Sequence, residues 1–344
     1  MQSGWVSTLW TVRSGRDEIV AAMLNDAESL KYVELSEESG VRTTVETSAE
    51  IFRGSQAYRG ADFLAVEEPL EIQLAYGPVG SRWVKSISVT MRTPRHDFEL
   101  AAGFLMSEGV VSDSADITEI TYLAGSSHPG GTARDGGGRM DAAVLPYQPE
   151  RNIVQVKLAP DVSVNMANLE RNFYTTSSCG ICGKASLLAL RTVCPPRAVN
   201  GFQVAAQALY SLPARLRDAQ KVFQRTGGLH AAGLFDSTGQ LFSSREDVGR
   251  HNAVDKLLGA EFLGDHTPLR DRLLLLSGRA SFELLQKSLM GGIPMVVSVG
   301  APSSLAVQVA REFDITLVGF LREDHFNVYH GAARVIGRSE ITGE

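Results

Sequence analysis

Residues 273–299 decide the fold class, because the stretch LLLLSGRASFELLQKSLMGGIPMVVSV contains a complete strand–helix–strand unit. The continuous apolar run at 273–276 predicts a strand that is buried on both faces. Residues 281–290 have helical periodicity, and residues 295–299 form a second apolar run. The apolar face of the helix consists of Phe282, Leu285 and Leu289. This order predicts an α/β sheet with helices on its faces.

The alternation of strands and helices continues on both sides of this unit. Upstream, a helix is expected over residues 203–224, followed by strands at 229–235 and 240–244 around the turn-rich quartet DSTG. Another helix is expected over residues 248–258. Downstream, one more helix precedes a last strand at 315–320. That helix has its buried stripe at Ala306, Val309, Ala310 and Phe313.

The amino-terminal part is less regular. Residues 1–57 mix polar and short apolar runs, and the Ser/Glu/Thr-rich part at 34–50 has no clean period. Further on, short strands are expected at 72–74 and 87–89, and a helix over 98–109. Glycines and polar residues fill 125–138, which predicts a surface loop, because no Gly-Lys-Ser/Thr sequence or helix follows to make it a phosphate loop.

These patterns divide the chain into three parts. Residues 1–57 are an extension of unknown role, residues 58–197 an α+β domain that ends in a cysteine motif and its helix, and residues 198–344 an α/β domain.

Charge and hydropathy exclude several classes of function. The chain has 344 residues, of which 44% are hydrophobic, as is normal for a globular protein. Thirty-three basic and 39 acidic residues leave a net charge of −6, so no overall basic field would attract nucleic acid or anionic lipid. No run approaches the roughly 18 apolar residues of a membrane helix, and no signal peptide is evident. We expect a cytoplasmic protein that binds neither nucleic acid nor membrane.

The strongest chemical signal lies at residues 175–186, TTSSCGICGKAS. Cys179 and Cys182 stand at a Ser/Thr-rich entry to an apolar helix, where unpaired N–H groups and the helix dipole favour the thiolate. Lys184 adds a positive charge, and the glycines after each cysteine leave room for a second protein or a cofactor. We therefore expect nucleophilic cysteines suited to group transfer between large partners.

A C-x-x-C pair can also hold a metal or form a redox disulfide. A structural zinc site needs four ligands, but this chain has no second cysteine pair, and its seven histidines are scattered. A deaminase zinc needs H-x-E and P-C-x-x-C at two helix starts, and the helices after residue 200 carry neither. A thioredoxin-like centre shares C-G-x-C at a helix start, yet no βαβ unit clearly leads into the motif, so a thiol–disulfide oxidoreductase ranks second.

Persulfide carriage is the preferred use, in which one thiolate attacks a donor persulfide and later releases its outer sulfur. We accordingly predict no structural metal. The third cysteine, Cys194, stands beside Pro195 and Pro196 and is expected to be a spare buried thiol.

Three loops in the carboxy-terminal half lie where strands lead into helices, at 244–252, 277–281 and 300–304. In open α/β sheets such strand ends form the ligand crevice. Their small residues, capping side chains and arginines suit phosphate. For any one loop taken alone helix capping is the favoured explanation, but the three loops together favour a polyanionic ligand. The candidate ligand-binding residues in these loops are Arg250, His251, Asn252, Gly278, Arg279, Ser303 and Ser304.

Six stretches of the chain resemble the FdhD family of formate dehydrogenase accessory sulfurtransferases. They are RNFYTTSSCGICGKAS (171–186), TGGLHAA (226–232), REDVGRHNAVDK (245–256), SGRASFE (277–283), APSSL (301–305) and GFLR (319–322). The resemblance implies a homodimer whose carboxy-terminal half is a three-layer, cytidine deaminase-like domain, joined to a smaller β-containing amino-terminal domain.

The same resemblance implies a function. Proteins of this family take sulfur from a cysteine desulfurase and deliver it to the bis-molybdopterin guanine dinucleotide cofactor, which is bound as substrate and then enters formate dehydrogenase. Cys179 would be the persulfide carrier and Cys182 an assisting thiol. The matching cofactor-binding stretch is Gly319, Phe320, Leu321, Arg322, Glu323 and Asp324.

Three questions stay open at the level of sequence. Phe320 either stacks on the guanine or pterin or is an ordinary core residue. His251 either bonds a phosphate or only caps its own helix. The protein could also be a chaperone that holds the cofactor without transferring sulfur.

Overall fold

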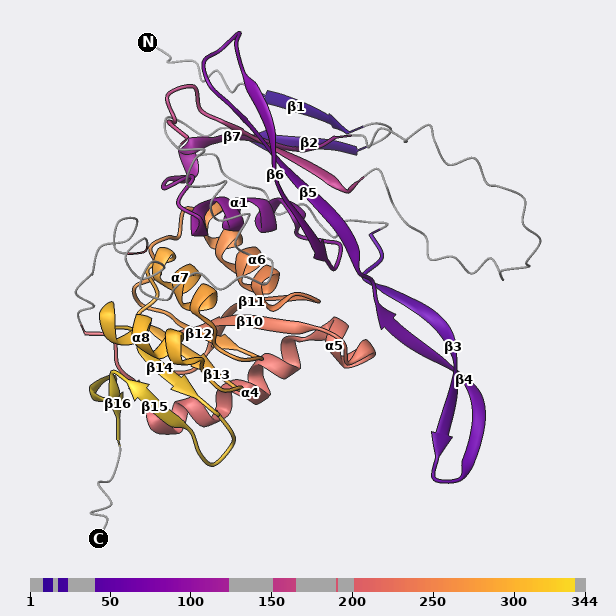
Figure 1. Ribbon diagram of the computed structural model, residues 1–344, viewed down its shortest axis with the longest axis vertical. Helices are drawn as coiled ribbons and strands as arrows, with labels where there is room; N and C mark the ends of the chain where they lie inside the picture. The colour runs from indigo at the N-terminus through magenta and orange to yellow at the C-terminus, as the bar shows by residue number, and fades with distance from the viewer. Residues whose placement is uncertain are drawn as a thin grey trace, which may run out of the picture.

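The computed structural model describes residues 9–14, 18–23, 41–123, 151–164, 190 and 201–337. Within these residues it is a mixed α/β protein with several sheets, as predicted (Figure 1). The first two strands, β1 (Leu9–Ser14) and β2 (Glu18–Met23), pair with each other in antiparallel fashion.

A six-stranded sheet forms the centre of the carboxy-terminal half. In spatial order its strands are β11 (Leu241–Asp247), β10 (His230–Phe235), β12 (Leu273–Leu276), β13 (Met295–Ser298), β14 (Thr316–Gly319) and β15 (Asn327–His330). β12, β13 and β14 are parallel, whereas β10, β11 and β15 run antiparallel to their neighbours. Every residue of the three parallel strands is buried, which confirms the burial predicted for residues 273–276.

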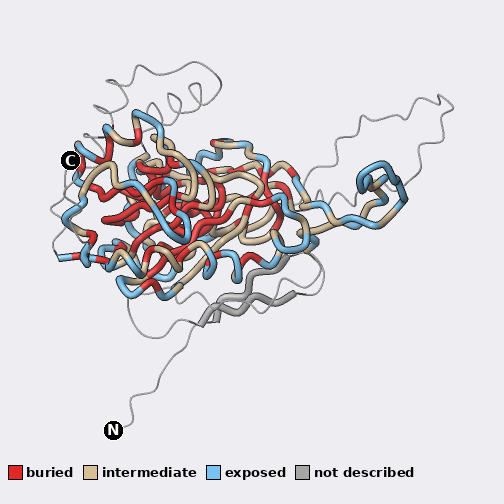
Figure 2. The backbone as a smooth tube through the Cα atoms, turned by 90° about the horizontal axis from the view of Figure 1, so that it is seen from below, coloured by how far each residue is buried: buried red, intermediate tan, exposed pale blue. Residues whose placement is uncertain are grey.

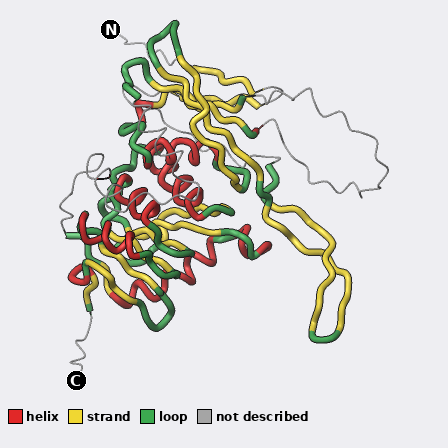
Figure 3. The backbone as a smooth tube through the Cα atoms, in the orientation of Figure 1, coloured by secondary structure: helices red, strands yellow, loops and turns green. Residues whose placement is uncertain are grey.

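Helices cover both faces of this sheet (Figures 1 and 3). On one face lie α6 (Arg250–Leu263), α7 (Phe282–Met290) and α8 (Ser304–Glu312), and on the other lies α4 (Ala206–Ala219). Alternate residues along β12 belong to the two apolar clusters, Leu274 and Leu276 to one and Leu273 and Leu275 to the other. The predicted stripe of the last helix is confirmed, because all four of its residues are buried.

The second sheet belongs to the amino-terminal half and has four strands. In spatial order they are β6 (Trp83–Arg92), β5 (Glu68–Tyr76), β8 (Ile153–Leu158) and β7 (Ile117–Tyr122). Between this sheet and α6 lies α1 (Asp97–Ser107), and one apolar cluster runs from the sheet through both helices into the six-stranded sheet. The two halves therefore share a core, while the division at residues 57 and 197 stays a prediction.

A long hairpin extends away from this body (Figure 1). It consists of β3 (Thr44–Arg53) and β4 (Gln56–Ala65), and most of its residues are exposed or only partly buried (Figure 2). No periodicity in residues 34–50 predicted this strand. The remaining elements are α5 (Lys221–Thr226), β9 (Val204–Ala205), β16 (Val335–Ile336), and the short 3-10 helices η1 (Ser114–Asp116) and η3 (Ala332–Arg334).

Two predictions about elements are wrong in detail. The single helix expected over residues 203–224 begins with β9 and is interrupted at Gln220, after which the Glu246 carboxylate accepts hydrogen bonds from the Val222 and Phe223 N–H groups and so caps α5. The strand expected at 315–320 is not the last, because β15 and β16 follow it. No helix among the described residues is long and apolar enough to cross a membrane.

Candidate functional site

The ends of five strands meet at one edge of the six-stranded sheet. The parallel strands β12, β13 and β14 end there, and β10, which is antiparallel to β12, begins there with His230. β11 ends at the same edge, because Asp247 pairs with His230. The three loops predicted from the sequence therefore lie next to one another, as the rule for open α/β sheets anticipates.

Backbone hydrogen bonds join two of these loops, 277–281 and 300–304, to each other and to the segment after β14. The Gly300 N–H donates to the Gly278 carbonyl at 2.9 Å, and the Ser303 N–H donates to the Ala280 carbonyl at 2.9 Å. The Phe320 N–H donates to the Gly300 carbonyl at 3.1 Å, so the segment after β14 is held in the same way. A Cβ on Gly300 would lie 2.9 Å from the backbone of Arg279, which explains why this position needs glycine.

Three basic side chains gather at this edge from two elements. His230 is the first residue of β10, and Arg250 and His251 are the first residues of α6. The His251 Nε2 lies 3.4 Å from the Ser281 hydroxyl and 3.9 Å from a Glu283 carboxylate oxygen. The Arg250 Nε is buried and has no hydrogen-bond partner within the described part of the chain. The edge therefore offers an unused donor next to two imidazoles.

Both imidazoles are held neutral near pH 7. Burial, reinforced by the positive charges of Arg250 and Lys287, lowers the pKa of His251 to about 4. Burial and the Arg250 charge also lower the pKa of His230. In each case the charged form is disfavoured because it would lose water and face another cation. A neutral imidazole can donate one N–H and accept at its other nitrogen.

The segment expected to bind cofactor, residues 319–324, lies at the same edge. Phe320 has a φ of 55°, a left-handed backbone conformation that strains a bulky residue. Its side chain is 38% exposed, so it is not a core residue. Arg322 donates from Nη1 to the Val299 carbonyl at 2.7 Å, while Glu323 and Asp324 are exposed. The structure thus presents an aromatic ring beside the glycine-lined loops.

The other predicted loop residues divide between capping and exposure. The Ser303 hydroxyl accepts from the Ala306 N–H at 3.2 Å and caps α8, while Ser304 and Arg279 are exposed. Gly278 lies against His230, since a Cβ there would be 3.3 Å from the imidazole Nδ1.

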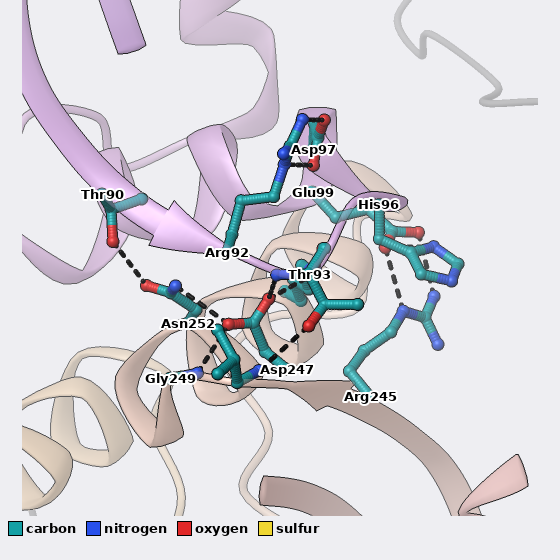
Figure 4. Close-up of polar contacts among 12 residues, drawn as sticks. Thr90, Arg92, Thr93, His96, Asp97, Glu99, Arg245, Asp247, Gly249 and Asn252 are labelled. Carbon is teal, nitrogen blue, oxygen red and sulfur yellow. Dashed lines mark hydrogen bonds and ion pairs between the residues drawn. The ribbon is translucent and has the colours of Figure 1, made fainter. Parts of the chain in front are cut away.

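Asn252 has a different place from the rest of the candidates. It is buried, and its amide nitrogen donates to the Met91 carbonyl at 2.7 Å and to Asp247 at 3.0 Å. Its amide oxygen accepts from the Thr90 hydroxyl at 3.1 Å. One amide proton and the amide oxygen therefore hold the start of α6 against β6, and the other amide proton binds the end of β11 (Figure 4).

Asp247 is the centre of this contact between the two halves (Figure 4). Its carboxylate accepts from the Thr93 N–H at 3.1 Å and from the Gly249 N–H at 2.8 Å. The Lys256 ammonium lies 2.7 Å from the same carboxylate and also donates to the Thr93 carbonyl at 2.7 Å. Asp247 and Lys256 are both buried, and their charges are satisfied by each other and by this backbone.

A second ion pair joins the halves nearby. Arg245 donates to both carboxylate oxygens of Glu99 at 2.9 Å each, and His96 lies 2.8 Å from the same carboxylate. Although burial opposes it, hydrogen bonds from His96 and Arg245 lower the pKa of Glu99 to about 2. The segment REDVGRHNAVDK therefore contributes to two regions. One set of its side chains holds the two halves together, and Arg250 and His251 lie at the edge of the six-stranded sheet.

Sequence patterns missed His230 and Glu283 as members of this cluster, whereas Ser281 lies in the predicted loop 277–281. His230 is a single histidine in TGGLHAA, and only the pairing of β10 with β11 brings it beside Arg250.

Cys179, Cys182 and Cys194 lie outside the described residues, as does the glycine-rich stretch 125–138. Their predicted structures stay predictions. Leu190, eight positions after Cys182, is described: it is helical and buried in the apolar cluster that joins the halves. Among the described ranges, no three His, Cys, Asp or Glu side chains gather as a possible metal site.

Comparisons with known proteins agree on one family. A model of the FdhD/NarQ family matches residues 65–336. The sulfur carrier protein FdhD of Streptomyces coelicolor is 50% identical over 282 residues, which cover 81% of this chain and 91% of that protein. The protein of the same name from Mycobacterium tuberculosis is 50% identical over 275 residues, covering 79% and 91%. The one from Saccharolobus solfataricus is 35% identical over 283 residues, covering 82% and 95%.

A solved structure shares the fold. A crystal structure from Desulfotalea psychrophila, described as a formate dehydrogenase accessory protein, superimposes with a TM-score of 0.59 at 22% identity and covers 86% of this chain and 100% of its own. At this identity the likeness shows the fold alone.

Proposed function

The chain belongs to the FdhD/NarQ family, and from this premise we propose that it is a sulfur carrier that serves formate dehydrogenase. Cys179 accepts sulfur from a cysteine desulfurase as a persulfide and delivers it to the bis-molybdopterin guanine dinucleotide cofactor. One observation supports this ligand most strongly: the loops after β12, β13 and β14 meet at one edge beside the buried Nε of Arg250, which has no hydrogen-bond partner among the residues that the structure describes.

The loading step is a thiol–persulfide exchange. The Cys179 thiolate attacks the outer sulfur of the donor persulfide, which forms a new S–S bond on Cys179 and breaks the S–S bond of the donor. The donor cysteine leaves as a thiolate, so no external oxidant or reductant is needed. The glycines that follow Cys179 and Cys182 leave room for the donor to approach.

The delivery step uses the second cysteine. The Cys182 thiolate attacks the inner sulfur of the Cys179 persulfide, forms a disulfide and releases the outer sulfur as hydrosulfide. With one proton, hydrosulfide replaces an oxygen ligand of the metal, and that oxygen leaves as water. A cellular dithiol then reduces the disulfide and resets the carrier.

The sheet edge would hold the cofactor during this transfer. The diphosphate of a guanine dinucleotide needs N–H donors and positive charge, which Arg250, the two imidazoles and the glycine-lined loops can supply. Phe320, exposed next to these loops, can stack on a planar heterocycle. Its strained backbone supports this role, because such conformations concentrate at ligand sites.

Finer properties rest on the family resemblance. We propose that the carboxy-terminal half is a cytidine deaminase-like domain without zinc, since its helix–sheet–helix layering fits and the helix starts contain other residues. We also propose that the protein works in the cytoplasm as a homodimer and contacts both the desulfurase and formate dehydrogenase.

Complementation separates this function from its rivals. In a strain that lacks its own carrier, Cys179→Ala should abolish formate dehydrogenase activity while the purified variant still binds guanosine diphosphate, and Cys194→Ala should restore activity fully. A chaperone without sulfur transfer predicts instead that Cys179→Ala restores activity. A thiol–disulfide oxidoreductase predicts that the wild-type protein reduces insulin disulfides and that Cys179→Ala and Cys182→Ala each remove that reaction.

A further inference from the structure

We infer that His230, Arg250 and His251 form a subsite for one phosphate group, and that this subsite takes up a proton as the phosphate binds. The inference rests on the proposed function, because it takes the sheet edge to be where the guanine dinucleotide binds. It adds two features to that proposal, namely the participation of His230 and a dependence of binding on protons.

Strand pairing and helix position bring the three side chains within electrostatic reach of one another. The pairing of His230 with Asp247 puts the start of β10 beside the end of β11, from which only two residues lead to Arg250. His230 also lies against Gly278, so its imidazole faces the loop that follows β12. On the other side, His251 is within 3.4 Å of the Ser281 hydroxyl at the start of α7.

Arg250 has a buried donor that needs an acceptor. A buried N–H group without a partner costs about 1–3 kcal/mol, and more when it carries charge. The Arg250 Nε is such a group among the described residues. A phosphate oxygen would satisfy it once the side chain turns towards the ligand, and the planar guanidinium can offer a second N–H to the same phosphate.

Neighbouring carboxylates do not neutralise this cluster. Asp247 is engaged by Lys256 and by the Thr93 and Gly249 N–H groups. Glu283 is 3.9 Å from His251, with its side chain 59% exposed, which leaves it a weak partner in water. The charged and titratable groups around the imidazoles are Asp247 from β11, Arg250 from α6, Glu283 and Lys287 from α7, and each imidazole itself.

Lys287 also disfavours the charged form of His251, but its own charge is paired with Asp255 at 2.8 Å, so it is not free to bind an anion. The remaining charge at the subsite is therefore positive. A binding anion would meet one permanent cation and two groups able to become cations.

Proton uptake follows from this environment. In the free protein, burial and Arg250 keep His251 neutral until the pH falls to about 4. Burial still disfavours the charged imidazoles in the complex, but a bound phosphate brings negative charge next to them and offsets the positive charge of Arg250, so it raises their pKa values. By linkage, the complex then holds more protons than its separate components, and the ligand binds more tightly as the pH falls towards about 4, the pKa of His251 in the free protein.

Calorimetry of guanosine diphosphate binding at pH 7 tests this directly. Titrations in buffers of different ionisation enthalpy give the number of protons taken up per ligand. We expect net uptake by the wild-type protein, and less by His251→Gln and by His230→Gln. His266→Gln is the matched control, because His266 pairs with Glu261 at the far end of α6, and it should match the wild type.

Arg250→Lys provides a second variant that preserves charge. It loses the guanidinium fork and should bind guanosine diphosphate about tenfold more weakly. Thermal unfolding of every variant shows whether the fold is retained. NMR titration of the histidine Cε1 protons should show an upward shift of the His251 pKa on saturation with the ligand.

The outcomes separate this inference from the function on which it rests. If guanosine diphosphate binds with equal proton uptake by wild type, His230→Gln and His251→Gln, the proton-linked subsite is wrong while the cofactor crevice stands. Tight binding that Arg250→Lys does not weaken also overturns the subsite. If the wild-type protein binds no guanosine diphosphate at millimolar concentration, the crevice assignment itself fails.

Discussion

Gly103 of α1 and Gly259 of α6 face each other where the two helices cross. A Cβ on Gly103 would lie 1.9 Å from the Asp255 carbonyl oxygen, and one on Gly259 would lie 1.8 Å from the Glu99 carbonyl oxygen. The backbones therefore touch directly, and the amino-terminal half is held against the helix whose first turn contains Arg250 and His251.

This close helix crossing predicts that replacing glycine with alanine destabilises the protein, the reverse of the usual effect. In an ordinary helix interior, replacing glycine with alanine stabilises a protein by about 0.5–1 kcal/mol. Here Gly259→Ala should instead lower the free energy of unfolding by about 2–4 kcal/mol, because the methyl group would force the helices apart. Urea denaturation measures the change. Gly228→Ala, where a Cβ would meet nothing closer than 3.8 Å, is the control and should change stability by less than about 1 kcal/mol.

Lys256 should be essential for stability. Lys256→Met would leave the buried Asp247 carboxylate without its cation, at a cost of about 3–5 kcal/mol in the free energy of unfolding. Lys157→Met breaks an exposed pair with Glu119 and should cost at most about 1 kcal/mol. Equal losses for the two variants would contradict the described role of the buried pair.

Glu99 should contribute stability that depends on pH. Its pKa is about 2 in the folded protein against an ordinary 4.5, so the stabilisation is complete above pH 5 and is lost as the pH falls towards 2. Glu99→Gln should thus be less stable than wild type at pH 7, by on the order of 2–3 kcal/mol. The difference between the two proteins should shrink in acid. A difference that stays constant from pH 7 to pH 3 would exclude this ion pair as its source.

Phe320 should strengthen ligand binding through its ring and lower the stability of the protein through its strained backbone. Phe320→Gly relieves the positive φ and should maintain or raise the melting temperature, since glycine adopts this conformation without strain. The same change removes the ring and should weaken guanosine diphosphate binding by about tenfold. Phe320→Ala should weaken binding equally without the gain in stability. If both variants bind guanosine diphosphate as tightly as the wild type, the exposed ring takes no part in binding.

Sequence patterns predicted the elements whose burial is regular. The apolar runs of β12 and β13 and the stripe of α8 lie in a continuous core, so their periodicity records which face is buried. The residues of the β3–β4 hairpin are exposed or only partly buried, so the hairpin has no buried face that would give its sequence a regular hydrophobic pattern. The break at Gln220 also escaped prediction, because the Glu246 carboxylate that caps α5 comes from another strand.

The sequence predicted only part of the candidate site. Loop position and composition indicated Arg250 and His251, which the structure places at the sheet edge. The contact of Asp247 with Thr93 joins residues that are far apart in the chain, so no local pattern could show that its segment also fastens the two halves. His230 enters the cluster only through strand pairing.

The central claim is that Cys179 carries sulfur, and intact mass spectrometry tests it most directly. After incubation with a cysteine desulfurase and cysteine, the wild-type protein should gain the mass of one sulfur atom, and a dithiol should remove it. Cys179→Ala should gain nothing, whereas Cys194→Ala should behave as wild type. A gain of sulfur by Cys179→Ala equal to that of the wild type would contradict the account.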